Sequence, residues 1–466
     1  MKTFKSLLLI ILIIFTFNTQ AQNNVELLKK IDNNLPILIE NVSIFNGIDS
    51  ILQHEMNVII ENGIITTIVK NNHVIPPKKY YKIDGENKVI MPGLVDAHVH
   101  LQGNGAVPWQ KVKVDMENNL SAYIYAGITT VYDLGGISSK SERLKNKIEK
   151  GKTFGPDIYH THIPITVKNS HPIPLSQELM PWPLNLLANT IIPTINSPEE
   201  AEKLISNYSK QKIDYVKIIC DQIPSGSPEM NNDQMTAICE AAHQKGFKVF
   251  AHIGSPQNAV DAISAGVDIL AHGIWRGKLT EKQADYIAES NVPIIYTLAG
   301  FINVDHINHG HFTPSEIDNL LIPNGVITPV KDSNGLAVHE QEIMGHFFND
   351  VSENEPHWLS NYRLLKERNV PIIVGTDSSF PGTYAGSTYY QELDELSDFG
   401  LSNFDILKGA TSLAAKLFID APNFGSVKIG QKANLLLLNE NPIQHLSTLK
   451  KPLTVIINGE IIVRKK

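Results

Sequence analysis

The chain has 466 residues, 42% of them apolar and 19% charged, which is the composition of an ordinary globular protein and excludes a collagen, a coiled coil and a wholly disordered chain. Lys and Arg number 40 against 48 Asp and Glu, and a formal net charge of -8 without a basic block gives no reason to expect a nucleic-acid partner. Two cysteines, Cys220 and Cys239, are too few for a disulfide scaffold, and a single bridge between them stays open.

Residues 1–21 have the pattern of a secretory signal peptide. Lys2 and Lys5 give a positive start, residues 6–17 are nearly all apolar, and residues 19–21 offer a small-residue cleavage site. As a helix the apolar run rises about 18 Å, too short for a hydrocarbon core of about 30 Å. We therefore expect export to the periplasm or the cell exterior, with an uncleaved anchor as the alternative. No later stretch is apolar enough to predict a membrane span.

The two ends of the remaining chain predict a small β-sandwich. Residues 22–88 contain short strand patterns with Asn62-Gly63 as a hairpin turn, and residues 420–466 contain similar patterns with Asn458-Gly459 as a second turn. Neither piece is large enough to bury a core alone. We expect them to form one β-sandwich domain together.

Residues 89–419 alternate short apolar runs with helix signals. Helix starts are expected at Ser197, Ser255 and Ser402, the last opening a helix that extends to about Phe418. Eight runs are typical of strands in a buried parallel sheet: residues 89–100, 128–134, 157–165, 215–220, 248–252, 267–272, 292–298 and 370–377. Eight alternations predict an α/β fold, a (β/α)8 TIM barrel, with a doubly wound sheet as the alternative.

The segment from about 299 to 356 fits no strand-helix unit. It carries Gly, Pro, Asn and several His, and a long insertion after a barrel strand is typically a lid or a binding loop. A flexible surface loop is the other interpretation.

Histidines spaced two apart identify candidate metal ligands, because such residues on a strand point to the same face. Three pairs occur, at His98/His100, His160/His162 and His309/His311. The first pair ends the first barrel run and is the best placed to chelate an ion.

Further candidates end other predicted strands, where barrel active sites lie. These are Lys217, His252, His272 and Asp377. Alone, His252 would be read as a satisfied core or loop histidine, and Lys217 as a solvated loop residue. An unpaired lysine inside an apolar strand is costly, however. Imidazole and carboxylate together suit zinc and leave open positions for water.

Residues 91–100, Met-Pro-Gly-Leu-Val-Asp-Ala-His-Val-His, resemble the opening metal motif of the amidohydrolase superfamily. Within it, the chain is most similar to the imidazolonepropionase-related and Xaa-Pro dipeptidase-like group. The resemblance covers nearly all of the chain after residue 21. It continues through residues 127–133, Lys217, His252, residues 265–268, His272 and residues 375–377, and then through residues 425–434, 441–442 and 458–459.

This resemblance implies a centre of two divalent ions, with zinc as the expected metal. His98 and His100 would bind one ion with Asp377, and His252 and His272 would bind the other. Lys217 would carry a CO2-derived carbamate that bridges both, because a carbamate removes the ammonium charge and supplies an anionic bidentate ligand. Two positions depart from the family pattern without being ligands: Ala271 stands where relatives commonly have Glu, and Asn434 replaces the usual Asp.

The expected reaction is hydrolysis of a C–N bond in an amide, a cyclic amide or a short peptide such as Xaa-Pro. A hydroxide that bridges the metals would attack, and Asp377 would act as general base and acid. An esterase, lactonase or phosphotriesterase on the same centre is one alternative, and a non-catalytic binding scaffold is another. The expected substrate contacts are His162, Tyr296 and Tyr384. The expected partner is a small molecule or short peptide, and a homo-oligomer stays open.

Overall fold

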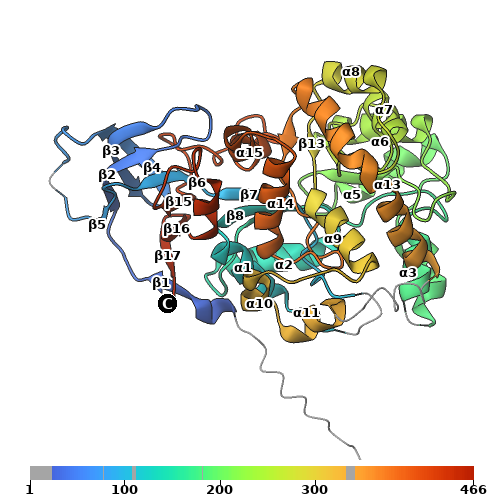
Figure 1. Cartoon of the computed structure of the whole chain (residues 1–466), viewed down its shortest axis with the longest axis horizontal. Coiled ribbons are helices and arrows are strands. Elements are labelled where there is room, and N and C mark those ends of the chain that lie inside the picture. The colour runs from blue at the N-terminus through green and yellow to red at the C-terminus, as the bar shows by residue number, and fades with distance from the viewer. Residues whose placement is uncertain (1–23, 77, 108–111, 181, 332–341, 466) are drawn as a thin grey trace, which may run out of the picture.

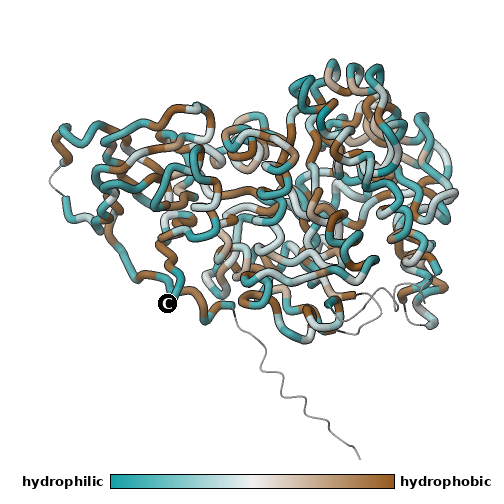
Figure 2. Tube along the Cα trace, in the orientation of Figure 1, coloured by the Kyte–Doolittle hydropathy of each residue, from teal (hydrophilic) through white to brown (hydrophobic). Residues whose placement is uncertain are grey.

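The computed structural model describes residues 24–76, 78–107, 112–180, 182–331 and 342–465 (Figure 1). The expected signal peptide lies outside these residues. The described chain forms a β-sheet body at one side and a larger α/β body at the other (Figure 1). Hydrophobic segments run through the interior of both bodies, and many of the outer loops and turns are hydrophilic (Figure 2).

The sheet body is built from both ends of the chain, as the sequence predicts. Its nine strands form one sheet in the order β1 (Leu28–Ile31), β17 (Glu460–Arg464), β16 (Thr454–Ile457), β15 (Leu435–Leu438), β6 (Val89–Pro92), β2 (Ile37–Ile44), β3 (Gln53–Glu61) and β4 (Ile64–Lys70), with β5 (Tyr81–Asp84) pairing with β2. Both expected hairpin turns are confirmed. Asn62 and Gly63 have φ of 50° and 76°, and Asn458 and Gly459 have 50° and 79°, the positive values that a tight two-residue turn requires.

The α/β body contains eight parallel strands, one in each of the eight predicted runs. They are β7 (Leu94–Val99), β8 (Ile128–Asp133), β9 (Asp157–His160), β10 (Val216–Ile219), β11 (Val249–His252), β12 (Ile269–Ala271), β13 (Ile294–Ile295) and β14 (Ile372–Ile373). Strands β7–β9 form one sheet and β10–β14 another, and parallel bridges Ile165–Ile218 and Val99–Ser378 join the two sheets at both seams. The predicted TIM-barrel fold is thereby confirmed.

The first predicted barrel strand, residues 89–100, is wrong at its start. The structure divides it into β6, which pairs with β15 in the sheet body, and β7, which pairs with β8 in the barrel. Gly93 lies between them, and a Cβ there would come within 2.2 Å of the Thr129 side chain. The chain therefore crosses between the two bodies at a position where only glycine fits.

Helices cover the barrel. Before β13 they are α1 (Met116–Tyr125), α2 (Ser138–Glu149), α3 (Ile173–Leu179), α4 (Ala188–Ile191), α5 (Ala201–Tyr208), α6 (Asn232–Gln244), α7 (Pro256–Ser264) and α8 (Glu281–Ser290). After β13 they are α9 (Leu298–Asn308), α10 (Glu316–Leu321), α11 (Asn324–Lys331), α13 (Glu342–Glu367), α14 (Ser387–Asp398), α15 (Asn403–Gly409) and α16 (Ser412–Ala415). The 3-10 turns are η1 (Asn24–Leu27), η2 (Leu184–Leu187), η3 (Pro198–Glu200) and η4 (Leu446–Lys450).

The three expected helix starts have different outcomes. Ser255 and Ser402 cap α7 and α15 through their side chains, as predicted. Ser197 precedes the 3-10 turn η3 and makes no side-chain cap bond. The prediction of a single helix from Ser402 to Phe418 is wrong. The chain leaves helical geometry at Thr411, which has φ of -139° and ψ of -92°, and a second helix, α16, begins at the next residue.

The segment 299–356, expected to be irregular, is mostly helical where the structure describes it. It contains α10 and α11, most of α9 and the first half of α13. Helix α13 packs against both α9 and α3. Glycine, proline and histidine suggested a loop, but buried residues such as Val304, Phe348 and Val351 fix these helices by tertiary packing.

Two further sequence questions concern the membrane and the cysteines. No helix within the described ranges has the length and apolar content that a membrane crossing requires. Cys220 and Cys239 are both buried and free, so the disulfide bond that the sequence allowed between them does not form in this structure.

Candidate metal centre

A cavity of about 450 Å³ opens at the carboxyl ends of the barrel strands. All six residues that the sequence proposed as metal ligands line it, and we call them the ligand cluster: His98, His100, Lys217, His252, His272 and Asp377. They lie within β7, β10 and β11 or in the segments that follow β7, β12 and β14. Parallel strands that close into a barrel therefore bring together residues almost 280 positions apart in sequence.

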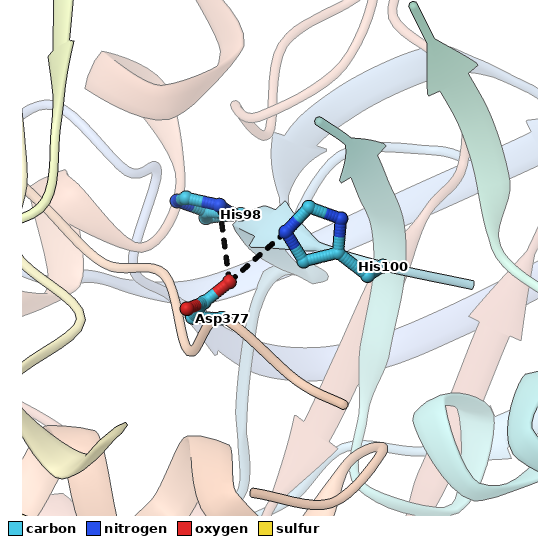
Figure 3. A group of neighbouring side chains, drawn as sticks. All are labelled: His98, His100 and Asp377. Atoms are coloured by element: carbon cyan, nitrogen blue, oxygen red, sulfur yellow. Dashed lines mark ion pairs between the residues drawn. The ribbon is translucent and has the colours of Figure 1, made fainter. Parts of the chain in front are cut away.

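Three members of the ligand cluster converge on one point (Figure 3). Oδ1 of Asp377 lies 3.2 Å from Nε2 of His98 and 3.1 Å from Nε2 of His100. Their ligand atoms all lie within 4.8 Å of one another. Oδ1 is buried and makes no hydrogen bond despite these approaches. Metal-ligand atoms that lie close together without being hydrogen-bonded to one another are the arrangement expected around a shared cation.

Hydrogen bonds on the far side of two rings set their orientation. Nδ1 of His100 donates to the carbonyl oxygen of Gly135 over 3.1 Å, which leaves Nε2 with its lone pair toward the cavity. Nδ1 of His272 lies 2.9 Å from the hydroxyl oxygen of Thr297 and is held in the same way. Such outer contacts fix the tautomer of metal-binding histidines.

The other half of the ligand cluster contains two packed imidazoles and a buried amine. The ring centres of His252 and His272 are 4.2 Å apart, and those of His98 and His272 are 4.6 Å apart. Lys217 is 2% exposed, and its Nζ has no hydrogen-bond partner. A buried amine without a partner is costly. Binding an ion, directly or as a carbamate, would remove that cost, so these residues fit the metal centre that the sequence predicts.

Burial keeps these groups in their metal-binding protonation states. It lowers the pKa of His252 to about 3 and holds the pKa values of His98 and His272 well below the usual range, so the three rings are neutral. Burial also lowers the pKa of Lys217 to about 7, which leaves much of the amine uncharged at neutral pH. For His100, burial lowers the pKa, but the close approach and negative charge of the Asp377 carboxylate outweigh burial and raise the net pKa.

Backbone strain accompanies the site. His272, Thr297 and Asp377 have φ of 76°, 47° and 53°, left-handed values that non-glycine residues rarely adopt. All three follow the last residues of barrel strands. Strained residues held by their surroundings are typical of functional sites.

Buried carboxylates that the sequence did not single out support the ligand cluster. Asp96 accepts hydrogen bonds from the backbone N–H and the hydroxyl of Thr376, next to Asp377, at 3.1 and 2.8 Å. Burial raises the pKa of Asp96 to about 7. Oδ2 of Asp221 lies 3.5 Å from Nε2 of His252, and its Oδ1 accepts from Arg276 at 2.6 Å.

The sequence contains features that could have identified the two aspartates as site residues. Asp96 precedes His98 by two residues and therefore shares its strand face, and Asp221 lies two residues after the end of β10. His171 also lines the cavity, with its ring centre 5.2 Å from that of His252, but it lies in the loop after β9, where periodicity gives no signal.

The three predicted substrate contacts are not among the residues that line the cavity, and their role in substrate binding stays a prediction. His162 accepts from the backbone N–H of Ser138, and its ring packs on Tyr208. Tyr296 packs edge-on against Tyr362, and Tyr384 packs against Phe312; both are buried in the core. Each lies near a strand end without contributing to the lining of the cavity.

The other two histidine pairs also remain outside the cavity. His160, the last residue of β9, is buried, and its Nε2 lies 3.8 Å from Glu142. His309 and His311 follow α9, and Nδ1 of His309 lies 3.2 Å from Asp305.

The two departures from the family pattern lie apart from the ligands. Ala271 is fully buried in the barrel core. Asn434 donates to Asp157 over 3.1 Å and accepts from the backbone N–H of Asn458 over 2.8 Å, so it links the sheet body to the barrel.

Comparison with known proteins agrees with the predicted resemblance. The model of the amidohydrolase family matches residues 89–462. An imidazolonepropionase of Psychromonas ingrahamii is 23% identical over 438 residues, which cover 91% of this chain and 98% of the relative. A dihydroorotase of Aquifex aeolicus is 21% identical over 416 residues, covering 84% and 86%.

Solved structures agree in fold. A Xaa-Pro dipeptidase with methionine bound in its active site superposes with a TM-score of 0.73 at 22% identity, over 91% of this chain and 99% of that one. This likeness confirms the barrel with its flanking sheet body.

Proposed function

The chain belongs to the amidohydrolase family, a hydrolase of carbon–nitrogen bonds, and we propose that it cleaves an amide, a cyclic amide or a short peptide with a binuclear metal centre. The observation that carries the proposal is the meeting of four imidazoles, one amine and one carboxylate in one cavity at the carboxyl end of the barrel.

The ligand cluster divides into two sets. His98 and His100 would hold one divalent ion with Asp377, and His252 and His272 would hold the other. Imidazole and carboxylate ligands favour zinc. Divalent ions bound there supply Lewis acidity, which polarises a carbonyl group and lowers the pKa of water.

Lys217 would bridge the two sets as a carbamate. Its neutral amine attacks the carbon of CO2, an N–C bond forms, and one amine proton leaves to solvent. The product is an anionic group with two oxygen ligands. The lowered pKa of Lys217 supports this step, because only the uncharged amine has the lone pair that attacks.

Asp377 would move the proton. Its carboxylate faces the cavity, is 19% exposed, and lies beside two imidazoles that fix its position. It would accept a proton from the attacking water and deliver it to the nitrogen of the leaving amine. The tetrahedral carbon then collapses, the C–N bond breaks, and a carboxylic acid and an amine leave.

A hydrolysis screen tests the proposal. The protein without residues 1–21 is reconstituted with zinc and bicarbonate and assayed on N-acyl amino acids, neutral amides, Xaa-Pro peptides, lactones and phosphotriesters, with Lys217→Ala as the control. Turnover of amides that is lost in Lys217→Ala supports the proposal. Preferential turnover of esters or phosphotriesters contradicts the assignment to C–N bonds. If the protein binds two metal ions but hydrolyses none of the compounds, the proposed range of substrates is contradicted.

We also propose that the protein is exported, from the pattern of residues 1–21. The N-terminal sequence of the protein from the producing cell tests this. A start at about residue 22 supports export, and an intact Met1 in the cytosolic fraction contradicts it.

A further inference from the structure

The wall of the cavity above the ligand cluster is apolar. Six side chains make up this apolar wall: Leu175, Ile223, Trp275, Phe301, Val304 and Phe347. They come from α3, from the loops after β10 and β12, and from α9 and α13. The Trp275 and Phe301 rings stack with their centres 5.3 Å apart. The apolar wall thus presents aromatic and aliphatic surface to whatever lies over the ligands.

Fixed charges are scarce in the same cavity. Within the described part of the chain, Lys217 is the one Lys or Arg that lines it, and Asp377 is the one Asp or Glu. Both belong to the ligand cluster. Neither a carboxylate nor an ammonium group on the substrate therefore finds an ion-pair partner along the apolar wall.

The nearby arginine is already fully engaged. Arg276 contacts Asp221 at 2.6 Å, Asp350 at 2.8 Å and the carbonyl oxygen of Gln222 at 2.6 Å. It does not line the cavity. Releasing its guanidinium to bind a substrate carboxylate would leave the buried Asp221 unpaired, which is costly.

We propose that the substrate is an uncharged amide with apolar groups on both sides of the scissile bond, and that a zwitterionic dipeptide is disfavoured. This narrows the proposed function and rests on it. Apolar groups gain by leaving water for the apolar wall, whereas a charge that loses its water without a partner raises the free energy of the complex. A cavity of about 450 Å³ suits a small organic molecule.

A matched pair of amides tests this charge preference. N-phenylacetylpyrrolidine and N-phenylacetyl-L-proline have the same scissile bond and differ only in one carboxylate. We expect kcat/KM on the zinc- and bicarbonate-loaded protein to be at least about tenfold higher for the neutral pyrrolidine amide. In titration calorimetry on metal-free protein, the pyrrolidine amide should also bind more tightly than the proline compound. Faster turnover or tighter binding of the proline compound would overturn the inference.

A cation placed in the apolar wall should reduce the preference, measured as kcat/KM, for the neutral pyrrolidine amide over the proline compound. Leu175 is partly exposed, so Leu175→Arg gives its charge access to solvent. We expect this variant to improve kcat/KM for the proline compound relative to the pyrrolidine amide by about tenfold. Leu175→Met adds no charge and should keep the wild-type order. If Leu175→Arg fails to fold, the wild-type pair alone decides.

The outcomes separate this inference from the proposed function. Preferential hydrolysis of the proline compound would overturn the inference and leave amide hydrolysis intact. If neither compound nor any other amide is hydrolysed, the proposed function fails, and the calorimetric order still decides whether the cavity prefers neutral ligands.

Discussion

The ligand cluster and the apolar wall face each other across one cavity but are built differently. The ligand cluster stands at the ends of parallel strands, and its side chains are fixed by bonds such as His100 to Gly135. The apolar wall comes largely from α3, α9 and α13, and α13 packs against both of the other helices. The three helices lie on the same side of the α/β body (Figure 1). Under the proposed function, the barrel strands would supply the reacting groups, and the helices around them would select the substrate.

This difference predicts different kinetic effects. Changes in the ligand cluster should lower kcat or metal affinity, because the proposed function has these groups bind the metals and act on the reacting atoms. Changes in the apolar wall should mainly raise KM, because these side chains contact the substrate and its transition state alike.

The largest effect is expected for Asp377→Asn. The amide side chain keeps the shape of the carboxylate but accepts no proton, so kcat should fall by about 10²- to 10⁴-fold. Steady-state kinetics and metal analysis measure the two consequences separately. Ser379→Ala, two residues further on, is the control and should fall far less. Full activity of Asp377→Asn would contradict its role in proton transfer.

A smaller effect is expected for Asp221→Asn. Asp221 lies beside Nε2 of His252, and neutralising it should lower zinc affinity by about 10- to 100-fold through the orientation of that ring. Asp350→Asn is the matched control, because Asp350 also pairs with Arg276, whereas the carboxylate beside His252 is that of Asp221. Competition with a zinc chelator measures the affinity. Equal losses in both variants would mean that Arg276, and not His252, mediates the effect.

In the apolar wall, Phe301→Ala should raise KM for a neutral aromatic amide by about tenfold with kcat nearly unchanged, since it removes binding area and no reacting group. Tyr384→Phe is the control and should leave both constants unchanged, because Tyr384 is buried away from the cavity. A loss confined to kcat in Phe301→Ala would show that the apolar wall also orients the reacting groups.

The smallest effect on catalysis concerns the anchor of α9, where the expected change is in stability. Glu392 in α14 accepts the backbone N–H of Ala299 over 2.7 Å, and burial raises its pKa to about 8. Between pH of about 4.5 and 8 the folded state therefore holds a proton that the unfolded state has lost, and stability falls as pH rises through this window.

Glu392→Gln removes this titration while keeping an oxygen acceptor. Its free energy of unfolding relative to the wild type should therefore increase from pH 5 to pH 9, by on the order of a few kcal/mol at most. Denaturant titrations at several pH values measure the difference. A difference that is independent of pH would contradict the raised pKa.

The sequence predicted the ligand cluster better than the apolar wall for a physical reason. Runs rich in Val and Ile mark buried parallel strands, and barrel geometry brings their ends together, so residues such as His252 and Asp377 could be placed. Direction is harder to predict: Tyr296 and Tyr384 lie near strand ends but pack into the core.

The apolar wall was not predicted because its helices depend on tertiary packing. Helix α13 includes Pro356, and α9 includes Gly300, so local propensity argued for a loop. Phe301 and Phe347 line the cavity because α9 and α13 pack together, and sequence periodicity does not predict that contact.

The most direct test is the metal content of the wild type and Lys217→Ala after reconstitution with zinc and bicarbonate. Lys248→Ala is the matched control, because that lysine precedes the next strand and pairs with Asp268 at the surface. We expect two zinc ions per chain in the wild type and in Lys248→Ala, and at most one in Lys217→Ala. Two ions in Lys217→Ala, or none in the wild type, would contradict the binuclear centre.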